Sequence, residues 1–180
     1  MTSAGIADNY FELFGLPESY DLDLTELSKR YRKLQNAVHP DKFASASDLE
    51  RRLSVQQSAL INEAYQTLKS PLRRAQYMLV RQGVDLSNET STRMDPGFLM
   101  QQMRLREELE QIRQSKDPAS KLLTLSTEID QGITELDSTL KLLFIENNTD
   151  KLDQITDFVR RMQFMLKLHQ EIEALEEELL

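Results

Sequence analysis

The amino-acid sequence predicts an all-α protein made of two helical modules. Leu, Gln, Glu, Arg and Met are abundant, and runs in which Val, Ile or Thr alternate with polar residues are missing, so the composition favours helix over strand. The five Gly and five Pro lie mainly at the boundaries of the apolar repeats. A polar segment over 84–95, rich in Ser, Thr and Asn, predicts a linker between a first module, 1–83, and a second module, 96–180.

The first module begins with two predicted helices. A short helix fits Asn9–Phe14 and ends at Gly15 and Pro17. The second helix begins after Asp23, and Glu26 follows three residues later, as in a capping box. Apolar residues recur along this second helix at helical spacing and form one stripe, which consists of Leu24, Leu27, Tyr31, Leu34 and Val38.

Two more helices complete the first module. Ser47 and Glu50 repeat the capping-box spacing at the start of the third helix. The pair Ser70–Pro71 supplies an N-cap and a first-turn residue for a fourth helix that reaches about Gln82. The apolar residues of the third helix are Leu53, Leu60, Ile61, Ala64, Tyr65 and Leu68.

The second module is predicted to contain three helices. The pairs Asp95–Pro96 and Asp117–Pro118 each combine an N-cap residue with Pro at the first helical position. The residues Asn-Asn-Thr at 147–149 break the pattern, and a last helix runs to the C-terminus. Three helices with short loops pack most simply as an up-down-up bundle. The expected core stripes are Phe98, Leu105, Leu109 and Ile112 on the first helix, and Ile155, Phe158, Val159, Met162, Leu166 and Ile172 on the last.

The composition excludes several classes of function. The chain has no Cys, which excludes disulfides, a thiolate nucleophile and metal sites built on its own sulfurs. The longest apolar runs have four residues, far fewer than the roughly 20 of a membrane-spanning helix, and the first ten residues lack the features of a signal peptide. Phosphate-binding and zinc-protease motifs are absent, and His169 is expected to be half-buried beside a helical neighbour. We therefore expect no catalytic residue, no metal and no cofactor.

Charge is divided unevenly between the two halves. Residues 1–84 carry 11 Lys and Arg against 10 Asp and Glu, whereas residues 85–180 carry 11 against 20. The acidic half argues against binding to nucleic acid, because a phosphate backbone requires a cationic surface. The uneven division indicates two modules with different partners.

The second helix and the turn after it form the most informative segment. Four cations lie opposite the apolar stripe, namely Lys29, Arg30, Arg32 and Lys33. Pro40 biases His39 away from helical angles, so the side chains of His39 and Asp41 are expected at an exposed tip, followed by Lys42. A basic face beside a rigid polar tip suits an acidic protein surface. A solvated helix face followed by an ordinary turn explains the same residues.

Some apolar residues of the second module lie away from the expected core. Met100 and Met103 point roughly opposite to the core stripe of their helix, with Leu99 between the two sides and Glu107 beside the methionines. On the last helix, Phe164 is expected to face away from the core. Flexible Met side chains suit an adaptable protein-binding surface. Packing against the first module and self-association are the structural alternatives for these residues.

Four segments of the first module, in order, resemble the J-domain of the DnaJ family. They are YFELFGLP (Tyr10–Pro17), HPDKF (His39–Phe43), INEAYQTL (Ile61–Leu68) and SPLRRAQYML (Ser70–Leu79). The resemblance implies that the second and third helices form an antiparallel hairpin with the HPD tripeptide in the loop. It also implies that this module binds the ATP-loaded form of a DnaK-type chaperone and biases it toward hydrolysis. The implied chaperone-binding residues are Lys29, Arg30, Arg32, Lys33, His39, Pro40, Asp41 and Lys42.

The second module narrows the resemblance to the HscB family. An acidic helical bundle follows the J-domain, in place of a Gly/Phe-rich tract and CxxC repeats. The similar strings are HPDKFAS (His39–Ser45), VQQSALINEAYQTL (Val55–Leu68), FLMQQM (Phe98–Met103) and LREELEQI (Leu105–Ile112). The resemblance implies a non-enzymatic co-chaperone of iron–sulfur cluster assembly with two partners, the chaperone HscA and the scaffold protein IscU.

The same resemblance assigns the scaffold-binding surface to the bundle. The implied residues are Leu99, Met100, Met103, Glu107 and Phe164. Two positions that are acidic in the familiar family member are Arg104 and Gln111 here, so apolar contacts are expected to dominate. A J-domain protein with a different client, and a helical structural protein in which HPD is an accidental turn, are the alternatives. A cytoplasmic location is expected, because the N-terminus does not resemble a transit peptide.

Overall fold

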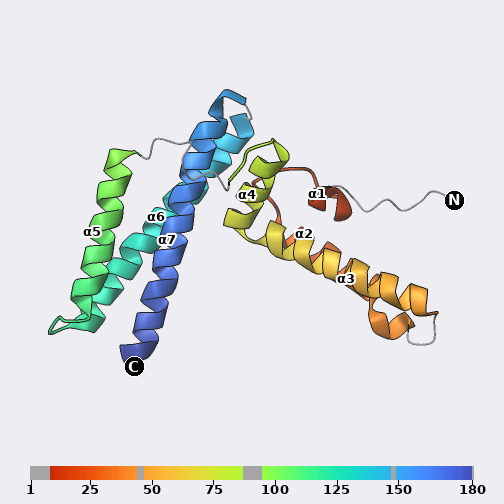
Figure 1. Ribbon diagram of the computed structural model, residues 1–180, viewed down its shortest axis with the longest axis horizontal. Helices are drawn as coiled ribbons and strands as arrows, with labels where there is room; N and C mark the ends of the chain where they lie inside the picture. The colour runs from red at the N-terminus through yellow and green to blue at the C-terminus, as the bar shows by residue number, and fades with distance from the viewer. Residues whose placement is uncertain (1–8, 44–46, 87–94, 147–148, 180) are drawn as a thin grey trace. The chain divides into compact units, whose positions relative to one another are not determined.

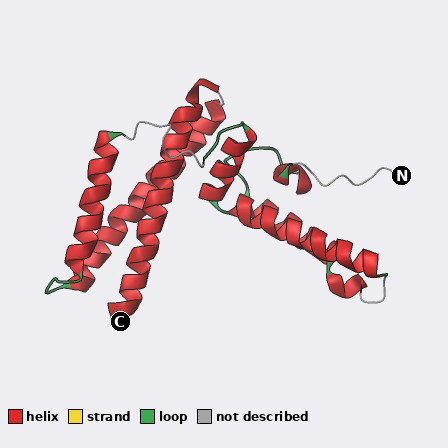
Figure 2. Cartoon of the chain, viewed as in Figure 1, coloured by secondary structure: helices red, strands yellow, loops and turns green. Residues whose placement is uncertain are grey.

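The computed structural model describes residues 9–43, 47–86, 95–146 and 149–179, and within these ranges every regular element is a helix (Figure 1). The all-α prediction is therefore confirmed, as the uniform colouring of the elements in Figure 2 makes plain. Contacts divide the chain into two compact units, Met1–Met78 and Leu79–Leu180. The linker predicted over 84–95 stays a prediction, because 87–94 lie outside the described residues.

The N-terminal unit is built around a helical hairpin. Its helices are α1 (Tyr10–Leu13), α2 (Leu24–Val38), α3 (Asp48–Lys69) and most of α4 (Pro71–Arg81), with a 3-10 turn at Pro40–Phe43. The long helices α2 and α3 pack side by side and run in opposite directions (Figure 1). The antiparallel hairpin that the sequence resemblance implied is thus present.

Apolar and polar contacts join the two helices of the hairpin. Leu27 of α2 is fully buried, and the ring of Tyr31 stacks on that of Tyr65 at 4.0 Å between centroids. Further along the hairpin, Gln35 Nε2 donates to the backbone oxygen of Ser58 at 3.1 Å. Contacts along the length of α2 therefore fix the end of this helix relative to α3.

The two predicted capping boxes have different outcomes. At α3 the box is complete: Ser47 Oγ accepts from Glu50 N at 3.3 Å, and the Glu50 carboxylate accepts from Ser47 N at 2.9 Å. At α2 only the Asp23 half forms, accepting from Glu26 N at 3.0 Å. The prediction for Glu26 is wrong, because its carboxylate binds Arg30 Nε at 2.8 Å instead. A cationic donor makes a stronger hydrogen bond than a backbone amide, and this bond lowers the pKa of Glu26.

The C-terminal unit is a bundle of three helices. They are α5 (Pro96–Ile112), α6 (Pro118–Glu146) and α7 (Leu152–Leu179), and a 3-10 turn at Thr149–Lys151 precedes α7. The helix starts predicted at Pro96 and Pro118 are confirmed, and Asp95 caps α5 by accepting from Gly97 N at 3.2 Å. Of the predicted break at 147–149, Asn147 and Asn148 lie outside the described residues.

The buried face of α5 is the predicted one, whereas that of α7 is displaced. Phe158 and Leu166 of α7 were predicted to belong to the core, but both side chains are only half-buried. Met165 and Leu168, which were not predicted, are buried instead. The reason is that α7 contacts both α5 and α6, so its buried face is wider than a single stripe. The main buried cluster consists of Leu105, Leu109, Ile112, Leu122, Leu125, Ile129, Met165, Leu168, Ile172 and Leu175.

Helices α6 and α7 come close together near the middle of the bundle. A Cβ atom at Gly132 would overlap the terminal methyl group of Met165, so the glycine permits the close contact. One turn further along α7, His169 Nε2 lies 3.0 Å from the carboxylate of Asp130, and Nδ1 lies 3.5 Å from that of Glu173. The prediction of a half-buried His with a helical neighbour is confirmed.

Candidate functional site

The first candidate surface is the turn that follows α2. His39 has non-helical backbone angles, φ −57° and ψ 128°, which end the helix immediately before Pro40. Lys42 N donates to the backbone oxygen of His39 at 3.0 Å and closes the 3-10 turn. The side chains of His39 and Lys42 are exposed, whereas those of Pro40 and Asp41 lie outside what the structure describes. An imidazole is therefore presented at the end of the hairpin, as predicted.

A buried hydroxyl holds the base of this turn. Ser54 Oγ of α3 donates to the backbone oxygen of Val38, the last residue of α2, at 2.8 Å. Sequence reasoning missed Ser54 and named its neighbour Leu53 among the apolar residues, but Leu53 is exposed. The signal was present, since Ser54 precedes Ile61, Ala64 and Leu68 at helical spacing and so lies on the buried stripe of α3. The orientation of His39 thus depends on a hydrogen bond between the two helices.

The basic face of α2 contains three solvent-facing cations, not four. The side chains of Lys29, Arg32 and Lys33 are exposed. Arg30 is different, because its guanidinium donates to the backbone oxygens of Phe14 and Gly15 after α1 and also binds Glu26. The prediction that Arg30 projects into solvent is therefore wrong. The guanidinium of Arg30 instead holds the loop after α1 against α2.

The second candidate surface is the outer face of α5. Leu99, Met100 and Met103 are 45%, 72% and 65% exposed, and the core residues of α5 lie on the opposite side of the helix. Glu107 is exposed beside them and accepts a hydrogen bond from Gln111 Nε2 at 3.3 Å. We call Leu99, Met100, Met103 and Glu107 the α5 face. It is an apolar surface with a carboxylate at one end, suited to binding another protein.

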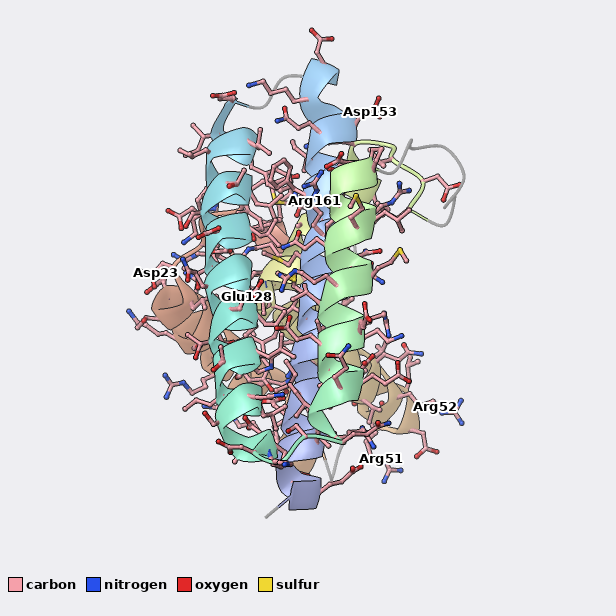
Figure 3. The ribbon with its side chains drawn as sticks, turned by 90° about the vertical axis from the view of Figure 1, so that its left-hand side faces the viewer. Asp23, Arg51, Arg52, Glu128, Asp153 and Arg161 are labelled. Carbon is pink, nitrogen blue, oxygen red and sulfur yellow. The ribbon has the colours of Figure 1, made fainter. Side chains whose placement is uncertain are left out.

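Arg104 brings less positive charge to the α5 face than its position suggests. Its guanidinium binds the carboxylate of Glu108 on α5 at 2.8 Å and that of Glu128 on α6. These carboxylates raise the pKa of Arg104, with the hydrogen bond to Glu128 as the main cause. Figure 3 shows Glu128 between α6 and α5. The Arg104 charge is thus largely neutralised within the bundle, and apolar contact remains the main property of the α5 face.

Phe164 does not face away from the bundle, and the prediction that it does is wrong. Its ring meets that of the buried Phe98 edge to face, at 5.8 Å between centroids, and it packs against the main core cluster. The guanidinium of Arg106 lies over the same ring at 5.6 Å. The reason is that α7 lies against α5 at this level, so the side of α7 that carries Phe164 is covered by α5. Phe164 is a half-buried support beneath the α5 face.

Arg161 of α7 is a second support that sequence reasoning missed. Its guanidinium lies 3.1 Å from the carboxylate of Asp95, the N-cap of α5, and 2.8 Å from that of Asp157. The rings of Phe98 and Phe158 lie on either side, at 5.0 and 5.4 Å from the guanidinium carbon. Figure 3 labels Arg161 between α7 and α5. It ties the start of α5, and with it the α5 face, to α7. Of these contacts, only the pair of Asp157 and Arg161, four residues apart on one helix, could be predicted from the sequence.

Neither surface has the features of a catalytic or metal centre. Among the described residues, no group of three or more His, Cys, Asp or Glu side chains could hold a metal ion. No helix in the described part of the chain is both long enough and apolar enough to cross a membrane. What the two surfaces offer is exposed charge on one unit and exposed apolar area on the other.

The hairpin of α2 and α3, with an exposed His39 at its end, defines a J-domain protein. The family model described as the DnaJ domain matches residues 9–77, and the model described as the HSCB C-terminal oligomerisation domain matches residues 94–173. The co-chaperone protein HscB homolog of Shewanella pealeana is 49% identical over 96% of this chain and 99% of its own length. The homolog of Shewanella halifaxensis is 48% identical over 95% of this chain and 98% of its own length. The chain belongs to the HscB family.

Solved structures agree with this assignment. The chaperone HscB from Vibrio cholerae has 42% identity and a TM-score of 0.84, covering 96% of this chain and 99% of its own. The human co-chaperone protein HscB has 25% identity and a TM-score of 0.87, covering 98% of this chain and 86% of its own. This chain is therefore a J-domain co-chaperone of iron–sulfur cluster biogenesis and not an enzyme, and a J-domain implies an Hsp70-type chaperone as partner.

Proposed function

We propose that this chain stimulates ATP hydrolysis by the DnaK-type chaperone HscA and delivers the iron–sulfur scaffold IscU to it. The observation that carries the proposal is the presence, in one chain, of an exposed His39 turn on the J-domain and an exposed apolar α5 face on the bundle. The first surface suits a chaperone and the second a client. A cytoplasmic location is part of the same proposal, and the bacterial relatives support it.

The chaperone side of the proposal rests on electrostatic complementarity. Lys29, Arg32 and Lys33 form a cationic face on α2, and the turn at His39–Lys42 continues from its end. An acidic surface on HscA would be attracted to this face, and the turn would then contact it at a fixed position. Stimulation follows if this contact is stronger in the hydrolysis-competent state of HscA than in its other states. The catalytic groups belong to HscA.

Separate replacement of Arg30 and Lys33 by Ala distinguishes a residue that supports the fold from one that contacts HscA. Arg30→Ala removes the hydrogen bonds to Phe14 and Gly15, and we expect it to cost about 1–3 kcal/mol of unfolding free energy. Lys33→Ala removes an exposed charge, so stability should change by less than about 0.5 kcal/mol, while affinity for HscA falls, most clearly at low salt. Thermal unfolding and titrations at two salt concentrations measure both effects. Equal stability losses, or HscA affinity unchanged in Lys33→Ala, would contradict the assignment.

The client side of the proposal rests on the exposed apolar area of the α5 face. Met100 and Met103 are flexible and polarizable, so they can adapt to the surface of a folded partner. Because Arg104 is already paired with Glu108 and Glu128, the apolar side chains are expected to contribute most of the affinity, with Glu107 and the half-buried Phe164 at the edges of the contact.

A competition experiment separates delivery of IscU from a generic adaptor. The full chain is immobilised, IscU is titrated onto it, and the titration is repeated with an excess of a permanently unfolded protein. We expect saturable binding of IscU that the unfolded protein does not displace, because a folded partner matches the shape of the α5 face. Displacement of IscU by the unfolded protein, or no binding of IscU, would instead favour a J-domain protein with another client.

A further inference from the structure

Hydrogen bonds across the hairpin show which part of α3 lies beside the His39 turn. Gln35 Nε2 donates to the backbone oxygen of Ser58 at 3.1 Å, and Ser54 Oγ donates to that of Val38 at 2.8 Å. A step along α2 toward the tip of the hairpin is therefore matched by a similar step toward the start of α3. Continued past Val38, this register places His39 level with the residue before Ser54. The turn after His39 also contacts α3 at the end of the hairpin (Figure 1).

One side of α3 is buried at the base of the hairpin and becomes exposed toward its tip. At 100° per residue, four apolar residues lie on this side, within about 60° of one another, namely Leu49, Leu53, Leu60 and Ala64. Ala64 is fully buried and Leu60 is half-buried, whereas Leu53 and Leu49 are 46% and 67% exposed. The apolar side of α3 therefore extends beyond the part that the rest of the N-terminal unit covers. We call Leu49 and Leu53 the α3 tip face.

Positive charge lies beside the α3 tip face. Arg52 is exposed, and Figure 3 shows its guanidinium pointing away from the helix. Lys42 is exposed in the neighbouring turn. Arg51 is paired with Asp48, and the carboxylate of Glu50 accepts hydrogen bonds within the capping box of α3. The surroundings of the α3 tip face therefore carry the same sign of charge as the cationic face of α2.

We propose that the α3 tip face is a second, apolar part of the chaperone contact and packs on an apolar surface of HscA next to the one that His39 meets. This inference rests on the proposed function, and it adds residues of α3 to a contact so far assigned to α2 and the turn. Two observations favour HscA as the occupant. The face is level with His39, and the charges beside it match the acidic surface that the cationic face of α2 requires. A second copy of the chain would instead bring like charges together.

The two parts of the contact have different roles. The charges of Lys29, Arg32 and Lys33 act over a distance and accelerate the encounter with HscA, but salt screens them. The two leucines act only on contact, because burial of their exposed area removes apolar surface from water. That burial stabilises the complex mainly by slowing its dissociation. The contribution of the α3 tip face should therefore persist at a salt concentration where the cationic face contributes little.

The double variant Leu49→Ala and Leu53→Ala tests this inference, with Val55→Ala as the matched control. Val55 is 55% exposed on the same helix, but it lies on the opposite side from Leu53. Ala retains the preference for helix in all three changes. We expect the concentration for half-maximal stimulation of the HscA ATPase to rise roughly tenfold in the double variant, at both about 0.05 M and about 0.3 M salt, and less than about twofold in Val55→Ala.

The variant His39→Gln, measured in the same assay, separates this inference from the proposed function. If His39→Gln loses stimulation while the double variant equals the unchanged chain, the α3 tip face is wrongly assigned and the proposed function remains. An equal rise in Val55→Ala, or an effect of the double variant that disappears at the higher salt concentration, would also overturn the inference. Full stimulation by His39→Gln would overturn the proposed function and this inference with it.

The single variant Leu49→Ala keeps the test valid if the double variant folds poorly. Leu49 is the more exposed of the two leucines, so its truncation should leave the melting temperature unchanged while the half-maximal concentration rises roughly threefold. A membrane surface is the competing occupant of an apolar face with cations beside it. Binding of the chain to phosphatidylglycerol vesicles that is lost in Leu49→Ala, with stimulation of HscA unchanged, would assign the face to a membrane and contradict the inference.

Discussion

Replacement of His39 by Gln is expected to abolish stimulation of the HscA ATPase by this chain, with turnover returning to the rate of HscA alone. His39 is exposed, and its position is fixed by the turn at Pro40–Phe43 and by the Ser54 hydrogen bond at the end of α2. Gln keeps a polar side chain of similar length but lacks the planar ring and cannot carry a charge. The loss should therefore occur in the contact with HscA and not in the hairpin. Steady-state ATP turnover measures it.

The other histidine of the chain supplies a matched control. His169 lies in the bundle between Asp130 and Glu173, and it is not part of the proposed HscA contact. His169→Gln should leave ATPase stimulation intact, and binding of IscU by His39→Gln should equal that of the unchanged chain. Full stimulation by His39→Gln, or equal losses in both histidine variants, would remove His39 from the proposed chaperone surface.

The double variant Met100→Ala and Met103→Ala is expected to weaken binding of IscU roughly ten- to 100-fold, which corresponds to about 1.4–2.8 kcal/mol. Both side chains are mostly exposed in the free chain, at 72% and 65%, so their truncation removes little from the folded core. The melting temperature should therefore change by no more than a few degrees. Isothermal titration with IscU and thermal unfolding of the same samples measure the two quantities.

Phe164→Ala provides the contrast for this prediction. The ring contacts Phe98 and packs on the core cluster, so truncation should lower stability by about 1–3 kcal/mol and can disturb the α5 face indirectly. A loss of binding in that variant alone would not identify Phe164 as a contact residue. If the Met100 and Met103 variant instead melts as early as Phe164→Ala, the two methionines belong to the core and the α5 face is wrongly assigned.

Local signals in the sequence were sufficient to predict where most helices begin. Ser47, Asp95 and the Ser70–Pro71 pair each act within a few residues of the helix they start, so the sequence nearby contains the whole cause. The buried face of α5 was predictable for the same reason, because one stripe at helical spacing faces its neighbours. The tip at His39 followed from the restriction that Pro40 places on the preceding residue.

Residues whose roles depend on distant parts of the chain were predicted less well. Arg30 lies next to Lys29 in the basic segment, and only the position of the loop at Gly15 beside α2 makes it a structural support. Phe164 was placed outside the core because its own helix supplied no information about where α5 lies. Arg161 binds Asp95 from 66 residues away, a pairing that no local pattern contains. These contacts are set by tertiary packing.

The central claim is that one chain presents two separate surfaces that must act together, and a mixing experiment tests it most directly. HscA turnover is measured with IscU, using the unchanged chain or an equimolar mixture of His39→Gln with the Met100 and Met103 double variant. We predict that IscU increases turnover only with the unchanged chain, because each variant in the mixture lacks one of the surfaces. Full IscU-dependent stimulation by the mixture would contradict the account.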